Sequence, residues 1–348
     1  MSNLEKIDRN FAVETSLKIE GIRFYDVKQA PFTTYGLIYE DGQYQRMPAA
    51  VAETVSDRVY AIHYHTSGGR VKFVTNSSYI AIKAEMPSIT RMSHFALAGS
   101  AGFDLYVGKR EQYFSTFMPP CNMQSGYENV IHFPDRKKRE ITINFPLYSP
   151  VSALYIGLED TATVTKTAGY AQDKPLVFYG SSITQGGCAS RPGNAYSARV
   201  ARALQMDYIN LGFSGNAKGE QEMADYIAGL NMAAFIYDYD YNAPDVAHLE
   251  QTHQRMFQTV RRANPTLPIL ILSRPKYYPT EEEKQRLAII RKTYTDAIAG
   301  GDQNVYFIDG KTLMKYAKND GTVDGVHPTD LGFDSMAKVL TQKLKTIL

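Results

Sequence analysis

The second half of the chain alternates between short apolar runs and helical stretches, and this rhythm constrains the fold more than any other feature. From Lys174 onward, five apolar runs are each followed by a loop and a helical stretch. The runs are residues 176–179, 208–211, 233–239, 269–272 and 305–308. Repeated strand–loop–helix units form a parallel sheet with helices on both of its faces. We therefore expect an α/β domain here.

Helix signals accompany these runs. Thr280 followed three residues later by Glu283 is a capping box, and this helix is expected to stop at Gly300. The last helix carries one apolar stripe that includes Phe333 and Leu340. Further helices are predicted over residues 194–205, 220–229 and 245–263.

The first half has a different rhythm, with short strand-like segments separated by turn residues. Strands are predicted over residues 58–65, 70–74, 79–84, 103–107, 130–133, 140–145 and 153–158. Closely spaced short strands are typical of a β-sandwich or jelly roll. A polar stretch at 165–173 separates the halves, so we predict an all-β, jelly-roll-like sandwich domain over 1–170 and the α/β domain over 171–348.

Composition excludes several function classes. Hydrophobic residues make up 44% of 348 and the net charge is +2, as in a soluble globular protein without a nucleic-acid-binding surface. Two cysteines cannot build a disulfide framework or a multi-cysteine zinc site. No apolar stretch reaches the roughly 20 residues of a membrane span. Residues 1–10 lack the apolar core of a secretory signal, which predicts a cytoplasmic protein. A periplasmic or secreted location stays open, because a removed signal leaves no trace.

Two short motifs carry the chemistry. Residues 180–184, Gly-Ser-Ser-Ile-Thr, follow the first apolar run of the second half, and residues 324–328, Asp-Gly-Val-His-Pro, precede the last helix. A serine at a strand exit can expose its hydroxyl, and a D-x-x-H loop can set a carboxylate against an imidazole. The combination suits a nucleophile, a base and a group that orients the base.

Two more polar segments lie between these motifs. Gly215 follows the second run and Asn242 follows the third. Ligands of open α/β sheets bind at the carboxyl ends of the strands, where all four segments converge if the fold is correct. This convergence is more specific than any of the motifs alone.

The second half, residues 174–348, resembles the SGNH hydrolase superfamily, also called GDSL-type esterases and lipases. The resemblance implies a flavodoxin-like, three-layer α/β/α domain, with Ser182 as nucleophile, His327 as general base and acid, and Asp324 orienting it. It also implies an oxyanion hole formed by the backbone N–H groups of Ser182 and Gly215 and the side-chain amide of Asn242. No metal or organic cofactor is implied.

The sequence departs from the family pattern at three positions. Ser181 stands where the family usually has aspartate, Asp240 where it has glycine, and Ala243 where it has aspartate. These positions bear on substrate preference more than on activity. Arg191, Tyr196 and Asp240 are further candidates for contact with substrate.

The first half also shows a partial resemblance. Residues 102–106, Gly-Phe-Asp-Leu-Tyr, match a G-x-D-L-Y signature of β-rich N-terminal domains attached to some SGNH hydrolases. Such two-domain proteins are mostly bacterial, and several act on carbohydrate or small-molecule esters. The signature itself suits a tight strand start or part of an active-site rim.

Other interpretations fit less well. Residues 180–187 lack the G-K-[ST] ending of a phosphate-binding loop and the G-x-S-x-G elbow of α/β-hydrolases. His63 and His65 alternate as on a strand surface and lack an evident third metal ligand, and His94 is taken as a surface or packing residue. Cys188 is expected to line the pocket without a redox role.

The sequence therefore predicts a serine esterase that hydrolyses short-chain, preferentially acetyl, esters of a carbohydrate or another hydroxylated small molecule. An acyltransferase with the same triad is one alternative. The other is a carbohydrate-binding protein whose hydrolase domain is inactive. The oligomeric state is not indicated.

Overall fold

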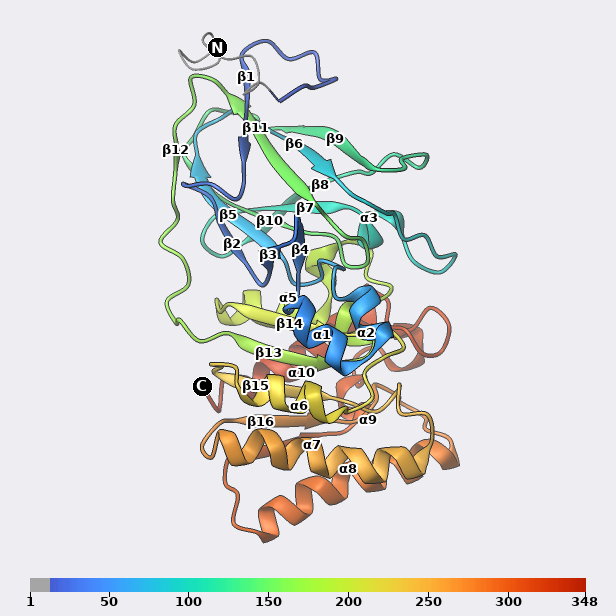
Figure 1. Ribbon diagram of the computed structural model, residues 1–348. Helices are drawn as coiled ribbons and strands as arrows, with labels where there is room; N and C mark the ends of the chain where they lie inside the picture. Colours follow the sequence, from blue (N-terminus) through green and yellow to red (C-terminus); the bar gives the residue numbers. More distant parts are fainter. Residues whose placement is uncertain (1–12) are drawn as a thin grey trace.

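The computed structural model describes residues 13–348, which form a β-sandwich on top of an α/β domain (Figure 1). The N-terminal stretch 1–10, in which we expect no secretory signal, lies outside the described residues. Within residues 13–348 no helix is both long and apolar enough to cross a membrane.

The first half is a sandwich of two mainly antiparallel sheets, as predicted. One sheet has the order β1-β11-β6-β9, and the other has the order β12-β5-β10-β7-β8 with β2 also paired to β5. Inward-facing residues of both sheets, such as Phe73, Ile82 and Ile143, form one apolar cluster between them. The strands are β1 (Ile22–Asp26), β2 (Thr33–Tyr35), β5 (Arg70–Thr75), β6 (Tyr79–Glu85), β7 (Phe103–Val107), β8 (Gln112–Phe117), β9 (Gly126–His132), β10 (Arg139–Asn144), β11 (Ala153–Glu159) and β12 (Val164–Thr165).

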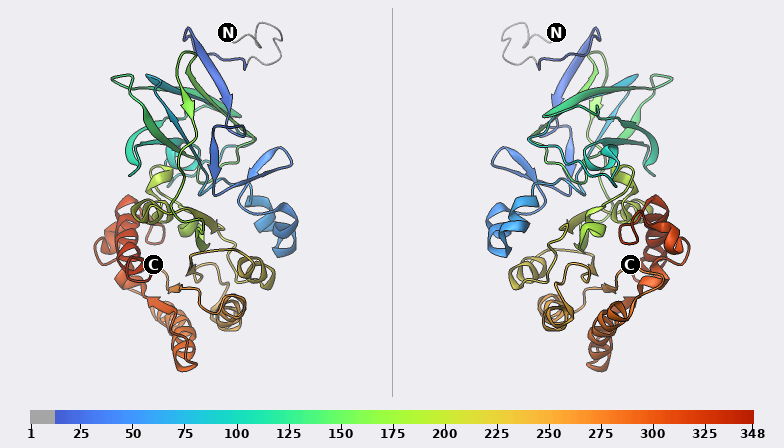
Figure 2. Two further views of the ribbon diagram at one scale, coloured as in Figure 1. Left: turned by 90° about the vertical axis from the view of Figure 1, so that its left-hand side faces the viewer. Right: turned by 90° about the vertical axis from the view of Figure 1, so that its right-hand side faces the viewer.

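The strand predicted at 58–65 is wrong. This segment contains helix α2 (Asp57–Ile62), which follows α1 (Ala49–Val55) and the hairpin of β3 (Ile38–Glu40) and β4 (Gln43–Gln45). Ser56 starts α2 because its side chain accepts a hydrogen bond from the Val59 backbone N–H, and that cap outweighs the alternating pattern. Val59 packs in the apolar cluster of the α/β sheet, and Figure 2 shows both helices beside the boundary between the domains.

The second half is a five-stranded parallel sheet with the order β14-β13-β15-β16-β17, which is 2-1-3-4-5 in chain order. This flavodoxin-like order agrees with the prediction. Side chains alternate between the faces, so that Phe178 packs with one layer of helices while Val177 and Tyr179 pack with the other. The strands are β13 (Leu176–Gly180), β14 (Tyr208–Gly212), β15 (Ala234–Asp238), β16 (Ile269–Leu272) and β17 (Val305–Ile308).

Helices cover both faces of this sheet (Figure 2). Helices α5 and α10 pack on one face, and α6 and α7 pack on the other. Both hydrogen bonds of the predicted capping box at Thr280 and Glu283 are present at the start of α8. The helices are α4 (Ser182–Gln185), α5 (Tyr196–Leu204), α6 (Gln221–Ala228), α7 (Val246–Ala263), α8 (Glu281–Ala299), α9 (Gly310–Leu313) and α10 (Asp330–Leu344), while α3 (Leu97–Ser100) lies in the first half.

Buried charged groups join the two domains. Arg70 of β5 is fully buried and pairs with Asp207, directly before β14. Asp104, in the middle of the G-x-D-L-Y signature, is also fully buried and accepts hydrogen bonds from Arg191 Nη1 and the Gly193 N–H, both at 2.9 Å. The signature therefore lies at the contact between the domains, and its aspartate holds the loop that follows α4.

Candidate active site

Ser182 occupies the first turn of helix α4, immediately after β13. The neighbouring Ser181 caps this helix, because its side chain accepts a hydrogen bond from the Ile183 N–H at 3.2 Å. Ser182 is therefore not needed as the cap, and its Oγ lies 3.0 Å from Nε2 of His327. Only 8% of Ser182 is exposed, so the hydroxyl lies in a recess rather than on an open surface.

His327 and Asp324 are paired within the loop before α10. Asp324 Oδ2 lies 2.7 Å from His327 Nδ1, and Asp324 Oδ1 accepts the backbone N–H groups of Val326 and His327 at 2.9 and 2.7 Å. Partial burial by itself would raise the pKa of Asp324, but hydrogen bonds from the imidazole and the two N–H groups lower it to about 2. The carboxylate therefore stays ionised and fixes which imidazole nitrogen faces Ser182.

Three candidate hydrogen-bond donors follow the carboxyl ends of neighbouring strands of the sheet, at Ser182 after β13, Gly215 after β14 and Asn242 after β15. Within residues 13–348 the backbone N–H groups of Ser182 and Gly215 donate to no other protein group. Gly215 has a φ of +72°, which glycine adopts readily. Asn242 Oδ1 accepts the Ala217 N–H at 3.3 Å, which leaves the amide nitrogen of Asn242 free to donate. These three groups are therefore free to donate, and their joint role as an oxyanion hole stays a prediction.

The sandwich domain contacts α4 directly, which the sequence analysis missed. The Tyr148 hydroxyl donates to the backbone carbonyl of Ser182 at 3.0 Å, and Ser67 Oγ donates to the carbonyl of Gln185 at 2.6 Å. Tyr148 and Ser67 are buried. No local pattern marks either residue, because each acts only through a contact with a distant part of the chain.

Gln185, at the end of α4, joins both domains to the loop that carries Gly215. Its Oε1 accepts the Ser214 N–H at 2.9 Å, and its Nε2 donates to His65 Nδ1 and to the Leu147 carbonyl at 3.0 and 3.1 Å. Burial, together with the charge of Arg46, lowers the pKa of His65 to about 3, so the ring is neutral and Nδ1 can accept. His65 is thus a supporting residue beside the site, and not a strand-surface residue.

Arg46 supports the same loop from the sandwich side. Its guanidinium donates to the carbonyls of Gly212 and Ile62 and lies 4.5 Å from the centre of the Phe213 ring. The segment leading to Gly215 is thereby held between Arg46 and Gln185.

Of the three residues predicted to contact substrate, two are buried. Tyr196 is fully buried and bonds to Thr184 at 2.9 Å, so it has no free surface for a ligand. Asp240 is 1% exposed and pairs with Arg274 at 2.6 Å, which ties the loop after β15 to the loop after β16. Both side chains therefore hold parts of the protein together and present no surface to a substrate. Arg191 is held by Asp104, and its contact with substrate stays a prediction.

His94 and Cys188 stand beside the imidazole of His327. The rings of His94 and His327 have centres 5.4 Å apart, and His94 comes from the sandwich. Burial and the nearby Asp324 raise the pKa of the Cys188 thiol to about 12, so it is protonated and does not compete with Ser182 as a nucleophile.

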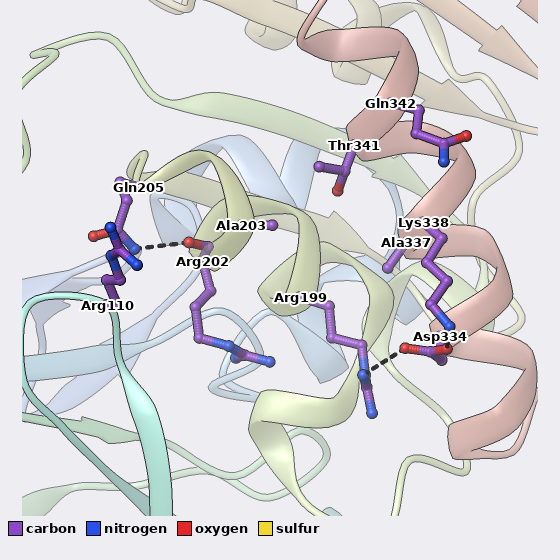
Figure 3. Close-up of a pocket in the computed structure, with 10 residues that line it drawn as sticks. All are labelled: Arg110, Arg199, Arg202, Ala203, Gln205, Asp334, Ala337, Lys338, Thr341 and Gln342. Atoms are coloured by element: carbon purple, nitrogen blue, oxygen red, sulfur yellow. Dashed lines mark hydrogen bonds and ion pairs between the residues drawn. The ribbon is translucent and has the colours of Figure 1, made fainter.

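A separate surface cavity of about 580 Å³ lies between α5 and α10 (Figure 3). Arg199 on α5 points toward Asp334 on α10 and pairs with it at 3.0 Å. None of the residues that line this cavity belongs to the serine, histidine and aspartate group, so the cavity is not the site described here.

Two parts of the chain match the models of known protein families. Residues 173–345 match the model of the GDSL-like lipase/acylhydrolase family, and residues 22–164 match the model described as the N-terminus of SGNH-hydrolase-type esterases. Among curated protein sequences none matches this chain significantly.

Several solved structures share the whole two-domain arrangement. A protein described as a GDSL-like lipase from Bacteroides ovatus is 28% identical, with a TM-score of 0.84 over 94% of this chain and 98% of its own. The salicylyl-acyltransferase SsfX3 from a tetracycline biosynthetic pathway is 20% identical, with a TM-score of 0.75 over 94% and 98%. An acetyl xylan esterase from Butyrivibrio proteoclasticus is 14% identical, with a TM-score of 0.62 over 93% and 98%.

Proposed function

We propose that this chain, which belongs to the GDSL-like lipase/acylhydrolase family and is a carboxylic ester hydrolase, removes short acyl groups from a carbohydrate. The preferred acyl group is acetyl, and the reaction passes through an acyl-enzyme on Ser182. The observation that carries this proposal is the hydrogen-bonded series of Ser182, His327 and Asp324, at 3.0 and 2.7 Å. This series supports the proposal, because covalent acyl transfer uses a nucleophile, a base and an orienting carboxylate in hydrogen-bond contact.

The proposed reaction uses these groups in turn. His327 Nε2 takes the proton of Ser182 Oγ as the oxygen attacks the ester carbonyl carbon. The resulting oxyanion accepts hydrogen bonds from the N–H groups of Ser182 and Gly215 and the amide of Asn242. His327 then returns the proton to the departing alcohol oxygen. Water repeats the sequence on the acyl-enzyme, which releases the acid and restores Ser182.

Aromatic residues beside the His327 loop support a carbohydrate as the alcohol portion. Lys276 Nζ donates to the Gly325 carbonyl at 2.8 Å and thereby brings the following tyrosines to this loop. Tyr277 lines a cavity of about 260 Å³ that also includes Gly325, and Tyr278 is 62% exposed next to it. Exposed aromatic rings with a polar tip suit the apolar faces and hydroxyl groups of sugars.

The test is hydrolysis of chromogenic acetyl, butyryl and octanoyl esters, followed by acetyl release from an acetylated xylo-oligosaccharide. We expect turnover to fall with acyl length and to disappear in Ser182→Ala. Ser181→Ala is the matched control, because this serine caps α4 and does not face His327, so measurable turnover is expected to remain.

Two results would contradict the proposal. Full activity of Ser182→Ala would exclude this nucleophile. Acyl transfer to an added alcohol, with no release of acid to water, would favour an acyltransferase, the activity of the similarly folded SsfX3.

A further inference from the structure

Three metal-binding side chains from separate segments meet beside the proposed nucleophile. One ligand atom each from His94, Cys188 and His327 lie within 4.8 Å of one another. His94 precedes α3 in the sandwich, Cys188 follows α4, and His327 lies in the loop before α10. The cluster therefore exists only when both domains are folded and packed together.

The donor set and spacing suit a zinc-like ion. Zinc binds imidazole nitrogen and thiolate sulfur, and the ligands around a tetrahedral zinc lie roughly 3.3–3.6 Å apart. The present spacing needs shifts of about an ångström to reach that arrangement, which side-chain rotation supplies. His94 is exposed and so has room to rotate.

The backbone at Cys188 is a second, independent observation. Its φ of +84° lies in the left-handed region, which disfavours residues with a Cβ and would ordinarily be occupied by glycine. A side chain is nevertheless present there, and it points to the histidines. Unfavourable backbone conformations of this kind concentrate at functional sites.

We propose that His94, Cys188 and His327 form an inhibitory site for Zn²⁺ or a similar divalent transition metal. Three protein ligands leave one coordination position for water. The inhibitory part of this inference rests on the proposed role of His327 as general base, whereas the binding part does not.

Metal binding and catalysis exclude each other at His327. The metal takes the lone pair of one imidazole nitrogen, and the thiol of Cys188 releases its proton to solvent as the sulfur–metal bond forms. If Nε2 binds, the hydrogen bond to Ser182 is lost, and if Nδ1 binds, the hydrogen bond to Asp324 is lost. In either case the imidazole can no longer remove the proton of Ser182 in the required geometry.

The binding test uses Co²⁺ as a spectroscopic probe of the full chain. We expect a thiolate-to-cobalt charge-transfer band that Zn²⁺ displaces. Cys188→Ser should abolish the band and His94→Gln should weaken Co²⁺ binding at least ~10-fold, since even an outer partner of a metal ligand is worth that much. Cys121→Ser, which changes the other cysteine, and His132→Gln, which changes an exposed strand histidine, are the matched controls.

The inhibition test measures acetyl-ester hydrolysis against free Zn²⁺, each variant being compared with its own metal-free rate. We expect the half-inhibitory concentration to rise at least ~10-fold in Cys188→Ser and His94→Gln and to stay constant in the two controls. A chelator should restore activity. No cobalt band in the wild type, or equal inhibition in all variants, would overturn the proposal.

The two tests separate the two proposals. A chain without esterase activity that still gives the cobalt band would reject the proposed function and retain the metal site. Since His94 is exposed, His94→Gln remains informative if Cys188→Ser fails to fold.

Discussion

The α/β domain and the sandwich contribute to the site in different ways. The side chains of His327 and Asp324, from the α/β domain, are 24% and 38% exposed. Tyr148 and Ser67, the sandwich residues that touch α4, are at most 2% exposed. The proposed base and the carboxylate that orients it are thus partly exposed, while Ser182, at 8%, and the sandwich residues that hold its helix are buried.

This difference follows from what each group must do. A general base has to reach substrate and exchange protons, so it needs an open side. A supporting group holds its neighbours in one conformation, and burial with fixed hydrogen bonds achieves that. Substitutions in the α/β domain should therefore lower turnover without unfolding the chain, and substitutions in the sandwich should act on stability or on positioning.

The largest effect is expected for His327→Ala, which removes the proposed base. Turnover of an acetyl ester should fall ~10³-fold or more, with an unchanged melting temperature. Asp324→Ala should cost less, because the ring keeps its contact with Ser182. Normal turnover of His327→Ala would show that His327 is not the general base and that the reacting groups lie elsewhere.

The largest effect on stability is expected in the sandwich, at Asp104. Replacement by alanine leaves Arg191 without its buried partner, and breaking such a pair typically lowers stability by about 3–5 kcal/mol. Denaturant unfolding measures this change. Asp135→Ala is the control, since this carboxylate lies at the surface, where solvent screens its ion pairs with Lys137 and Arg139, and its loss should have a much smaller effect. Equal effects at the two sites would contradict a role for Asp104 in joining the domains.

Asn242→Ala tests a reacting-site donor that lies in a loop. Loss of one oxyanion donor typically lowers kcat by ~10²–10³-fold, with little effect on KM. Asn242→Asp is the sharper variant, because it keeps an oxygen for the Ala217 N–H but removes the amide donor. If Asn242→Asp is fully active, the side chain positions the loop and does not stabilise the oxyanion.

Asp238 lies in the α/β domain but is buried, so its substitution should change stability, and the change should depend on pH. Burial raises its pKa to about 7, against hydrogen bonds from Thr184 and Tyr196 that lower it. A raised carboxyl pKa means that the folded state holds the proton more tightly, so stability falls as pH rises from about 4 to about 7 and then levels off.

Asp238→Asn lacks this titration. Its melting temperature should equal that of the wild type near pH 4 and exceed it by roughly 10 °C at pH 8, because about three pKa units correspond to about 4 kcal/mol and each kcal/mol shifts the melting temperature by about 2–4 °C. Thermal unfolding across this range measures the difference. A constant offset at every pH would show that Asp238 does not titrate.

Much of the fold and part of the site follow from local sequence signals. The five parallel strands and the capping box at Thr280 are visible because each depends on residues close in sequence. Ser182 and the Asp324–His327 pair stand out for the same reason, since strand exits and a D-x-x-H loop are short patterns. Their roles remain proposals, but their proximity follows from the parallel sheet.

The rest depends on contacts between distant segments. His94 reaches His327, and Tyr148 reaches Ser182, only after the domains pack. The strand predicted at 58–65 failed for a related reason: Ser56 caps a helix there, and Val59 finds its apolar partners in the other domain. Single-segment patterns carry no information on such partners.

Tyr148 therefore provides the finest test of the comparison. Tyr148→Phe keeps the ring and removes only the hydroxyl that donates to the Ser182 carbonyl. That carbonyl also accepts the Gly186 and Gly187 N–H groups, so Ser182 should remain nearly in place. One hydrogen bond is worth about 0.5–1.5 kcal/mol, which predicts a ~2–10-fold lower kcat at constant KM. Tyr113→Phe, an exposed sandwich tyrosine, is the control. A fall as large as that of Asn242→Ala would mean that the sandwich shares in the chemistry and does not merely hold the residues that perform it.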